Sequence, residues 1–322
     1  MTYSRIAGTG RYLPERVLTN ADLEEKVDTT DEWIRTRTGI EQRHVAADDE
    51  QTSDLCVNAA RAAMEAAGVG VEDIDMVFVG TTSPDLIFPN IATIIQHKMG
   101  IPACPCYAVE AACSGFVYAL SSADKFIRCG DAKRVVVIGA EIITRLIDWN
   151  DRSTCVLFGD GAGAVVLEAA DEPGILSTHL GADGQYQKLL YYPVGVSTDL
   201  AAAGLGDSRI LMSGNDVFKV AVKTLSAVAE EALEANNVTI DALDWFVPHQ
   251  ANLRIIQATA KRLGVSMDKV IQTVQVHGNT SAASIPMAFD VAVRDGRIQR
   301  GQLVLLDAFG GGFTWGSVLL RY

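Results

Sequence analysis

The stretch Ala111-Ala112-Cys113-Ser114-Gly115-Phe116 joins two segments with different patterns, and the rest of the chain is best interpreted outward from it. An apolar run ending in Tyr107-Ala108-Val109-Glu110 predicts a buried strand, and the amphipathic segment 114–127 predicts a helix. Cys113 is therefore expected at a sharp turn between them. Free backbone N–H groups and the helix dipole favour an anion at a helix N-terminus, which makes Cys113 a candidate nucleophile. The alternative is that this cysteine is a small buried hydrophobic residue.

The segments on both sides of this turn alternate between strand and helix patterns. Apolar runs predict buried strands, and apolar residues at helical spacing between capping residues predict helices. This alternation is typical of an α/β fold with helices packed on sheets. The expected strands are 74–80, 134–139, 244–248 and 303–306, and the expected helices are 30–39, 54–67, 91–99, 216–235, 252–263 and one that begins near 285.

The composition of the 322-residue chain is that of a packed globular protein, with 48% hydrophobic and 21% charged residues. A net charge of −13 opposes nucleic-acid binding, because the phosphate backbone would be repelled. The first residues lack a secretion signal, and no apolar run approaches the roughly 20 residues that cross a bilayer. We therefore expect a cytoplasmic protein with neither a nucleic-acid nor a membrane partner.

Cysteine and glycine clusters raise the question of a metal or a nucleotide cofactor. Cys104-Pro105-Cys106 with His97 nearby would suggest zinc, but structural zinc usually needs paired ligand clusters and the chain has no second one. The glycines in 158–163 do not fit a dinucleotide fingerprint, because the run after them predicts a strand and not a helix. We expect no metal, no cofactor and, among six cysteines in a cytoplasmic chain, no disulfide framework.

The two halves of the chain overlay at a constant offset of 169 residues. Chance similarity between Val-rich strands is the competing explanation, but one offset that covers three separate features makes it the weaker one. We expect an N-terminal half over 1–173 and a C-terminal half over 174–322, with 174–207 as a connection or insertion. The matching pairs are 74–79 with 243–248, 135–138 with 304–307, and Cys113 with Ala282.

Four motifs are spread along the chain: Glu110-Ala111-Ala112-Cys113-Ser114-Gly115-Phe116, Val247-Pro248-His249-Gln250-Ala251-Asn252, His277-Gly278-Asn279-Thr280-Ser281-Ala282-Ala283-Ser284 and Phe309-Gly310-Gly311-Gly312-Phe313-Thr314-Trp315-Gly316. In order and spacing they resemble the β-ketoacyl-acyl carrier protein synthase III family, which starts bacterial fatty acid synthesis. The resemblance implies a thiolase-like α/β fold in which two duplicated βα halves form five layers, αβαβα. It also implies a homodimer that uses a CoA thioester and malonyl-acyl carrier protein (malonyl-ACP) as substrates.

The resemblance implies a decarboxylative condensation with an acyl-Cys113 intermediate. Cys113 would take the acyl group of an acyl-CoA, most often acetyl-CoA. His249 as a neutral N–H donor and the Asn279 amide would stabilise the enolate formed from malonyl-ACP. Backbone N–H groups of Cys113 and Gly311 would hold the tetrahedral oxyanion. Without the resemblance, His249 and Asn279 would more simply be satisfied buried polar groups.

Further residues are assigned to the substrates by the same resemblance. Trp33 and Arg37 would contact the CoA adenine, with Arg152 on the same nucleotide. Phe88 would line the acyl pocket across a dimer interface. On the predicted helix 252–263, positions 254 and 261 share one face, and a solvated basic face is the alternative to a docking patch. The residues proposed to dock the acidic ACP are Arg254, Lys261 and Arg262.

Three other functions remain open at this point. A related thiolase-fold enzyme of secondary metabolism or of long-chain condensation would use the same three residues on a different acceptor. A cysteine hydrolase would need His249 as a general base and water at the acyl-enzyme. A non-catalytic binding module would leave the nucleophile and both donors without a role.

Overall fold

Two mixed sheets and the helices that cover them make up the chain, seen in a computed structural model that describes residues 2–195, 197 and 209–322. The first sheet has the order β1-β7-β6-β4-β5, and the second has the order β11-β12-β13-β8. In each sheet a parallel part is followed by antiparallel strands. The strands are β1 Tyr3–Tyr12, β4 Met76–Gly80, β5 Cys106–Val109, β6 Arg134–Glu141, β7 Gly161–Ala170, β8 Ile175–Ala182, β11 Trp245–Pro248, β12 Leu303–Gly310 and β13 Thr314–Arg321.

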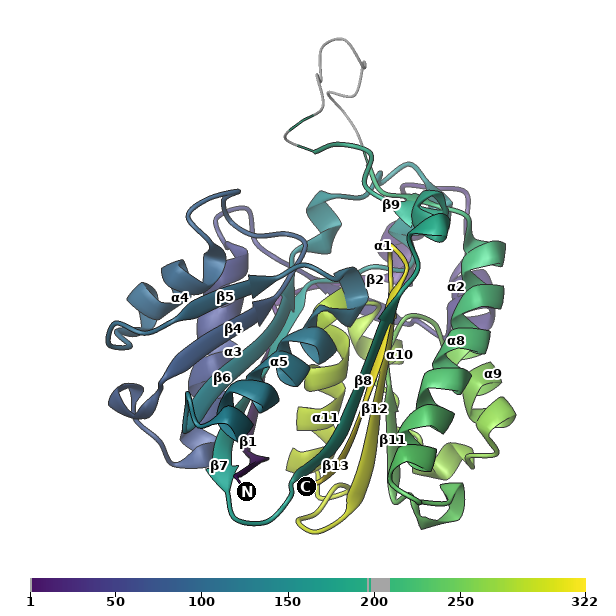
Figure 1. Ribbon diagram of the computed structural model, residues 1–322. Coiled ribbons are helices and arrows are strands. Elements are labelled where there is room, and N and C mark those ends of the chain that lie inside the picture. Colours follow the sequence, from purple (N-terminus) through teal and green to yellow (C-terminus); the bar gives the residue numbers. More distant parts are fainter. Residues whose placement is uncertain (1, 196, 198–208) are drawn as a thin grey trace.

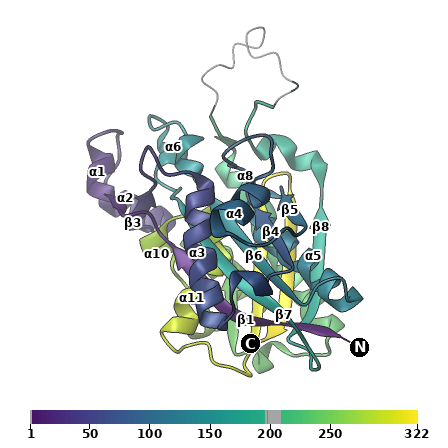
Figure 2. The ribbon, with the colours of Figure 1, turned by 90° about the vertical axis from the view of Figure 1, so that its left-hand side faces the viewer.

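Five layers follow from the way helices cover both faces of each sheet (Figure 1). Helices α5 (Gly115–Cys129) and α11 (Ser284–Arg294) lie between the sheets, where Phe116 and Phe289 share one hydrophobic cluster with Val137 of the first sheet and Val318 of the second. Helices α3 (Thr52–Ala67) and α4 (Ile91–Met99) cover the outer face of the first sheet, as Figure 2 shows. Helices α8 (Gly214–Ala235) and α9 (Leu253–Leu263) cover the second. The predicted αβαβα arrangement is confirmed.

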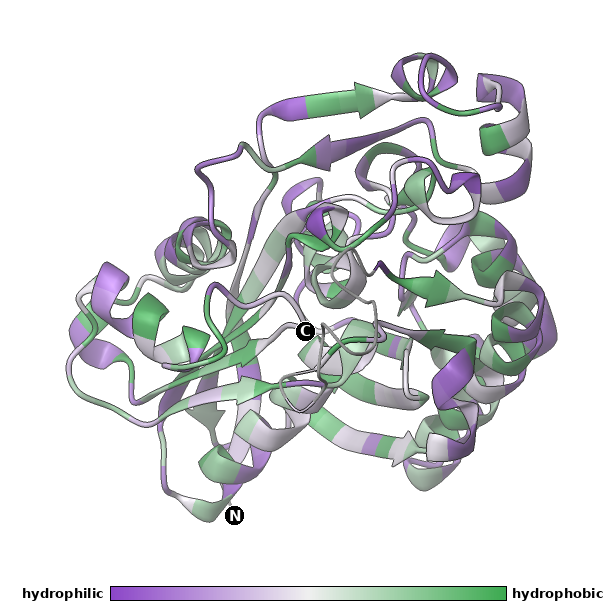
Figure 3. Cartoon of the chain, turned by 90° about the horizontal axis from the view of Figure 1, so that it is seen from above, coloured by the Kyte–Doolittle hydropathy of each residue, from purple (hydrophilic) through white to green (hydrophobic). Residues whose placement is uncertain are grey.

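Shorter elements surround and connect this framework. Seen from above, hydrophilic residues gather on the peripheral helices and connections (Figure 3). The short strands and helices are β2 Arg16–Thr19, α1 Asn20–Glu24, α2 Asp31–Thr38, β3 Gln42–Val45, α6 Arg152–Cys155, β9 Leu190–Tyr191, β10 Leu211–Met212 and α10 Val274–His277. The 3₁₀ turns are η1 Val71–Asp73, η2 Ala112–Ser114, η3 Ile143–Arg145, η4 Gly184–Leu189, η5 Ile240–Ala242, η6 Met267–Lys269 and η7 Ser281–Ala283.

The internal duplication is visible in the structure at the predicted offset. Strands β4 and β11, strands β6 and β12, turns η2 and η7, and helices α5 and α11 each begin 169 residues apart. The match extends to the backbone, because Ala112 and Ser281 occupy equivalent places with φ angles of 45° and 51°. Few non-glycine residues adopt this left-handed conformation, so its repetition indicates one turn used twice.

Some expected boundaries were wrong. Segment 174–207 is not simply a connection, because β8 at its start pairs along β13 in the second sheet. Strands β1 and β13 were not predicted, and α3 begins at Thr52 behind a Gln51 cap, not after Ser53. Residues 196 and 198–207 of the expected connection lie outside the described part of the chain. Among the described residues, every helix is too short or too polar to span a bilayer.

Candidate active site

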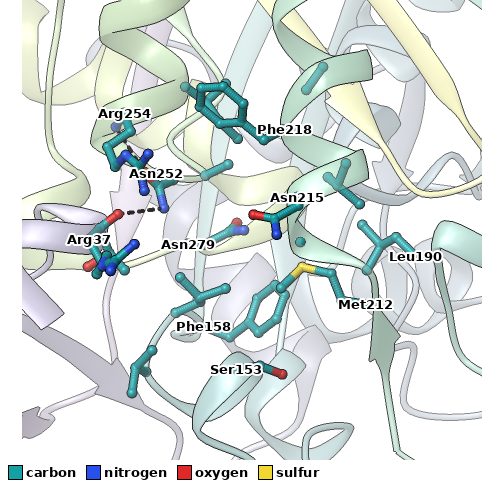
Figure 4. Close-up of a pocket in the computed structure, with 18 of the residues that line it drawn as sticks. Arg37, Ser153, Phe158, Leu190, Met212, Asn215, Phe218, Asn252, Arg254 and Asn279 are labelled. Atoms are coloured by element: carbon teal, nitrogen blue, oxygen red, sulfur yellow. Dashed lines mark hydrogen bonds between the residues drawn. The ribbon is translucent and has the colours of Figure 1, made fainter. Parts of the chain in front are cut away.

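A pocket of about 340 Å³ opens near the end of the central helices and brings three predicted residues together. Cys113, His249 and Asn279 all line it, although they come from distant parts of the chain. Figure 4 shows Asn279 facing the pocket between Asn215 of α8 and Phe158. The apolar part of the lining is Val156, Leu157, Phe158, Leu190, Met212, Val217, Phe218, Ala221, Leu225, Ile255 and Phe309.

Cys113 lies in η2, between the end of β5 and the start of α5, and only 8% of it is exposed. Burial raises the pKa of its thiol to about 12, while a hydrogen bond with Ser281 acts in the opposite direction. The expectation that the helix N-terminus favours a thiolate is therefore wrong, because desolvation raises the pKa of the thiol more than its hydrogen bonds lower it. Cys113 rests as a thiol and must lose its proton when it reacts.

His249 follows β11, and its hydrogen bonds select one form of the imidazole. Its Nδ1 lies 2.6 Å from the hydroxyl oxygen of Ser284. That oxygen already accepts the backbone N–H of Gln250 at 3.3 Å, so the Ser284 hydroxyl proton is free to point at Nδ1. Burial lowers the pKa of His249 to about 3, which keeps the ring neutral. With Nδ1 paired to Ser284, Nε2 is the ring nitrogen left for a ligand.

Asn279 is held at both its backbone and its side chain. Its backbone pairs with the segment beneath the pocket, through Asn279 N–H to the Leu157 carbonyl at 2.9 Å and Gly159 N–H to the Asn279 carbonyl at 3.0 Å. Its side-chain oxygen accepts the backbone N–H of Ser281 at 2.9 Å. Because the oxygen is occupied in this way, the amide nitrogen is the end left to donate.

Gly311 lies in the turn between β12 and β13. Hydrogen bonds join this turn to the turn that carries Cys113. Thr314 donates its hydroxyl to the Ala111 carbonyl at 2.8 Å, and Ser114 donates to the Thr314 carbonyl at 3.1 Å. A Cβ atom at position 310 would lie only 2.7 Å from the backbone nitrogen of Cys113, so the close contact of the two turns requires glycine there. The two turns are therefore in contact, but Gly311 is not among the residues that line the pocket in the described chain.

Three residues assigned to the CoA nucleotide gather at the pocket wall. Trp33 and Arg37 of α2 and Arg152 of α6 all line it. The guanidinium carbon of Arg152 lies 4.6 Å from the centre of the Trp33 ring, and that of Arg37 lies 5.9 Å away. Arg152 also donates to the Asp28 carbonyl at 2.6 Å. An aromatic ring flanked by two guanidinium groups can bind a flat, negatively charged ligand.

The remaining predicted residues separate into two places. Arg254 lines the pocket and lies over the Phe218 ring at 5.7 Å (Figure 4), while Lys261 and Arg262 are exposed at the far end of α9 and do not line it. Phe88 is 83% exposed and lies outside the pocket of this single chain.

Sequence reasoning missed three polar residues that the structure places behind the pocket. Ser281 and Ser284 belong to a motif quoted above, and no role followed from their spacing. Glu141 carried no sequence signal beyond an acid at the end of an apolar strand. In the described residues no group of three His, Cys, Asp or Glu side chains could hold a metal ion.

The chain is similar to known proteins over almost its whole length. Two family models match, 3-oxoacyl-acyl-carrier-protein (ACP) synthase III over residues 107–184 and its C-terminal counterpart over 233–322. Beta-ketoacyl-acyl-carrier-protein synthase III of Xanthomonas campestris is 63% identical over 320 residues, which cover 99% of this chain and 98% of the relative. The protein of the same name from Thiobacillus denitrificans is 60% identical over the full length of both.

A solved structure extends the likeness to the fold. The crystal structure of 3-oxoacyl-acyl-carrier-protein synthase III from Aquifex aeolicus is 45% identical, covers 99% of this chain and 100% of its own, and superposes with a TM-score of 0.94. The predicted resemblance is confirmed in sequence and in structure. The chain belongs to the 3-oxoacyl-acyl-carrier-protein synthase III family.

Proposed function

We propose that this acyltransferase condenses an acyl group from acyl-CoA, with acetyl-CoA as the expected donor, with malonyl-ACP to give a 3-oxoacyl-ACP. The observation that carries the proposal is the convergence of Cys113, His249 and Asn279 on one pocket. Relatives with 60% identity or more are named for this activity, so the alternative of a specialised condensing enzyme is not favoured.

In the first half-reaction the Cys113 sulfur attacks the acyl-CoA thioester, CoA leaves and the acyl group stays on the enzyme. Backbone N–H groups of Cys113 and Gly311 hold the oxyanion of this step. The contact between their two turns supports that assignment. Donors fixed in place before the reaction stabilise developing charge without reorganising.

In the second half-reaction malonyl-ACP loses carbon dioxide, and the enolate oxygen needs hydrogen-bond donors. His249 Nε2–H and the Asn279 amide nitrogen serve as these donors. Their other polar atoms are occupied by Ser284 and Ser281, which supports the assignment. The enolate carbon then attacks the acyl-Cys113 thioester and releases the Cys113 thiolate.

Trp33, Arg37 and Arg152 bind the CoA nucleotide, with the adenine against the Trp33 ring. Arg254, Lys261 and Arg262 form the ACP-docking face, defined by these three residues of α9. This face gives an acidic carrier a local positive surface on a chain whose net charge is −13. Arg254 lies at the pocket, and Lys261 and Arg262 lie at the far end of α9. The carrier would therefore lie along this helix with its end at the pocket.

The protein acts in the cytoplasm as a homodimer of chains whose halves, 1–173 and 174–322, each supply part of the site. The apolar edge of the first sheet supports the dimer. Strand β5 is its outermost strand, and Leu86, Ile87, Phe88 and Tyr107 expose large apolar side chains there. An unpaired strand edge with such residues favours association with a second copy. Phe88 would then reach the partner's acyl pocket.

Intact mass spectrometry after mixing with acetyl-CoA tests the proposal. Wild-type protein should gain one acetyl group at Cys113, and adding malonyl-ACP should remove it as 3-oxoacyl-ACP, not as free acid. Cys113→Ser should abolish condensation, whereas Cys129→Ser, at an exposed thiol, should not. Condensation by Cys113→Ser at the wild-type rate, or release of free acid alone, would contradict the proposed activity.

A further inference from the structure

A buried carboxyl group lies behind the nucleophile and is not used by the mechanism above. Glu141 ends β6 and is completely buried. Its Oε1 accepts a hydrogen bond from the Ser281 hydroxyl at 3.2 Å. Ser281 is in turn η7, which packs against the η2 turn of Cys113, and its hydroxyl also acts on the pKa of the Cys113 thiol. One serine hydroxyl therefore connects the nucleophile to a carboxyl group that has no contact with solvent.

The surroundings of Glu141 are built to accept a proton and to give it back. Thr81, Thr82 and Ser83, which follow β4, donate their hydroxyl groups to the carboxyl at 2.5 to 3.2 Å, and Thr82 adds its backbone N–H. These donors favour the charged form and burial favours the neutral form. Their balance raises the pKa of Glu141 to about 7. A group with this pKa exchanges protons near neutrality.

Few other ionisable groups act on Glu141. The thiols of Cys113 and of Cys56 on α3 interact with it electrostatically. On β7 the residue opposite Glu141 is Gly161, and on η7 the neighbour of Glu141 is Ser281. Neither of these residues carries a charge. The neighbours from β4 are the three hydroxyl residues already described. Burial and these hydroxyl donors therefore set the protonation of Glu141, and the Cys113 thiol is one of its ionisable neighbours.

We infer that Glu141 receives the Cys113 proton through Ser281 during acylation and returns it by the same route after condensation. This inference rests on the proposed function. As sulfur attacks the thioester, the thiol proton passes to the Ser281 oxygen and the Ser281 hydroxyl proton passes to Glu141. The carbon–sulfur bond to CoA breaks, and the CoA thiolate takes a proton from solvent. When the enolate carbon attacks acyl-Cys113, the released thiolate recovers the proton held by Glu141.

This route gives the buried Cys113 thiol the proton acceptor that it needs in order to react. A pKa near 12 leaves almost no thiolate at neutral pH, so a proton acceptor within reach is needed. His249 is a poor acceptor, because burial holds its pKa near 3. Glu141 is the better acceptor by basicity, and it leaves His249 neutral for its role as a donor.

The test is the rate of Cys113 acylation by acetyl-CoA, measured by rapid quench and intact mass between pH 5.5 and 9. Wild-type rates should rise with pH and level off above an inflection near 7, as Glu141 ionises. Glu141→Gln should lower the rate at pH 8 by about 10²-fold and remove the inflection. Ser281→Ala should also lower the rate and remove the inflection. The substitution keeps the hydrogen bond from the residue 281 N–H to the Asn279 side-chain oxygen. Alanine can adopt the positive φ of Ser281, because Ala112 adopts a similar φ in the equivalent turn.

Ser83→Ala is the matched control. It removes one donor to the carboxylate but leaves the path through Ser281, so the inflection should move to higher pH and the plateau should remain. A wild-type pH profile in Glu141→Gln or in Ser281→Ala would overturn the inference while leaving the proposed function intact. If the wild-type protein forms no acyl-Cys113 at all, both fail.

Discussion

Nδ1 of His249 lies 2.6 Å from the hydroxyl oxygen of Ser284, the first residue of helix α11. Residue 249 directly follows β11 of the second sheet, while residue 284 begins central helix α11, so this bond fixes the imidazole across two layers of the molecule. With Nδ1 engaged in this way, Nε2 is the ring nitrogen left free for a ligand.

Ser284→Ala should therefore slow condensation without slowing acylation. Loss of one buried hydrogen bond costs about 1 kcal/mol, and the other imidazole tautomer becomes accessible, so kcat for condensation should fall about 5- to 10-fold. Single-turnover kinetics with preformed acetyl-enzyme measure this step directly. Ser226→Ala, which removes a buried hydroxyl on α8 that donates to the Val222 carbonyl, serves as the control and should leave the rate unchanged.

Asn279→Ala should remove one of the two donors to the enolate oxygen. Removal of a single preorganised donor typically costs on the order of 10²–10³ in kcat, and the loss should appear in malonyl decarboxylation and condensation. Acetyl transfer to Cys113 should persist, as seen by intact mass. Asn215→Ala alters another amide in the same pocket and should have a far smaller effect. Equal losses in both variants would show that the pocket merely tolerates no alanine.

Asp307→Asn should change the dependence of stability on pH. Asp307 on β12 is completely buried, its two carboxyl oxygens have no hydrogen-bond partner among the described residues, and burial raises its pKa well above the ordinary value. The folded protein keeps a proton that the unfolded chain releases above about pH 4, so this group stabilises the fold less as pH rises. The asparagine variant has no such carboxyl, so its stability lacks this decrease with rising pH.

Urea unfolding at pH 5 and pH 8 measures the effect. The free energy of unfolding of Asp307→Asn, relative to wild type, should increase by up to about 1.4 kcal/mol per pH unit over this range. Asp295→Asn is the opposite case: Arg297 lowers the pKa of that carboxyl, which is ionised at both pH values. Its difference from wild type should be the same at pH 5 and pH 8. A constant difference for Asp307→Asn would mean that the carboxyl is ionised in the fold.

Charge reversal of the ACP-docking face should weaken carrier binding alone. Lys261→Glu with Arg262→Glu should raise KM for malonyl-ACP about 10-fold and leave acetylation by acetyl-CoA unchanged, because neither side chain lines the pocket. Salt should raise the wild-type KM for the same reason. Lys133→Glu makes the same kind of charge change at an exposed residue just before β6, away from α9, and should leave KM for malonyl-ACP unchanged. A rise in KM for acetyl-CoA would contradict the assignment.

The elements that could be predicted from the sequence are those specified by local signals. Helix α4 begins after Asn90, whose side chain caps its first turn, and α2 is bounded by Thr30 and Gly39 in the same way. Strands β1 and β8 escaped prediction because they are specified by pairing at long range. Residue Ser4 of β1, for example, lies opposite Ala169 of β7.

The same distinction holds for the site. Cys113, His249 and Asn279 could be predicted because their motifs are local and resemble those of a known family. The Ser281–Glu141 contact joins residues 140 positions apart, and nothing in either neighbourhood reports it. The pKa of Cys113 was misjudged for a related reason, since dipole effects follow from local sequence whereas desolvation depends on everything that packs around the thiol.

The repeated turn also explains why the proposed mechanism uses one nucleophile and not two. Ala282 stands where the second copy of the turn would carry its own sulfur, and it is 1% exposed. Its carbonyl presses on the backbone of β6 at Gly139, which has no side chain to resist it. The second copy of the turn therefore carries Ser281, next to Asn279, but no nucleophile of its own. Duplication here has produced specialisation in place of redundancy, so damage to the surviving thiol has no internal backup.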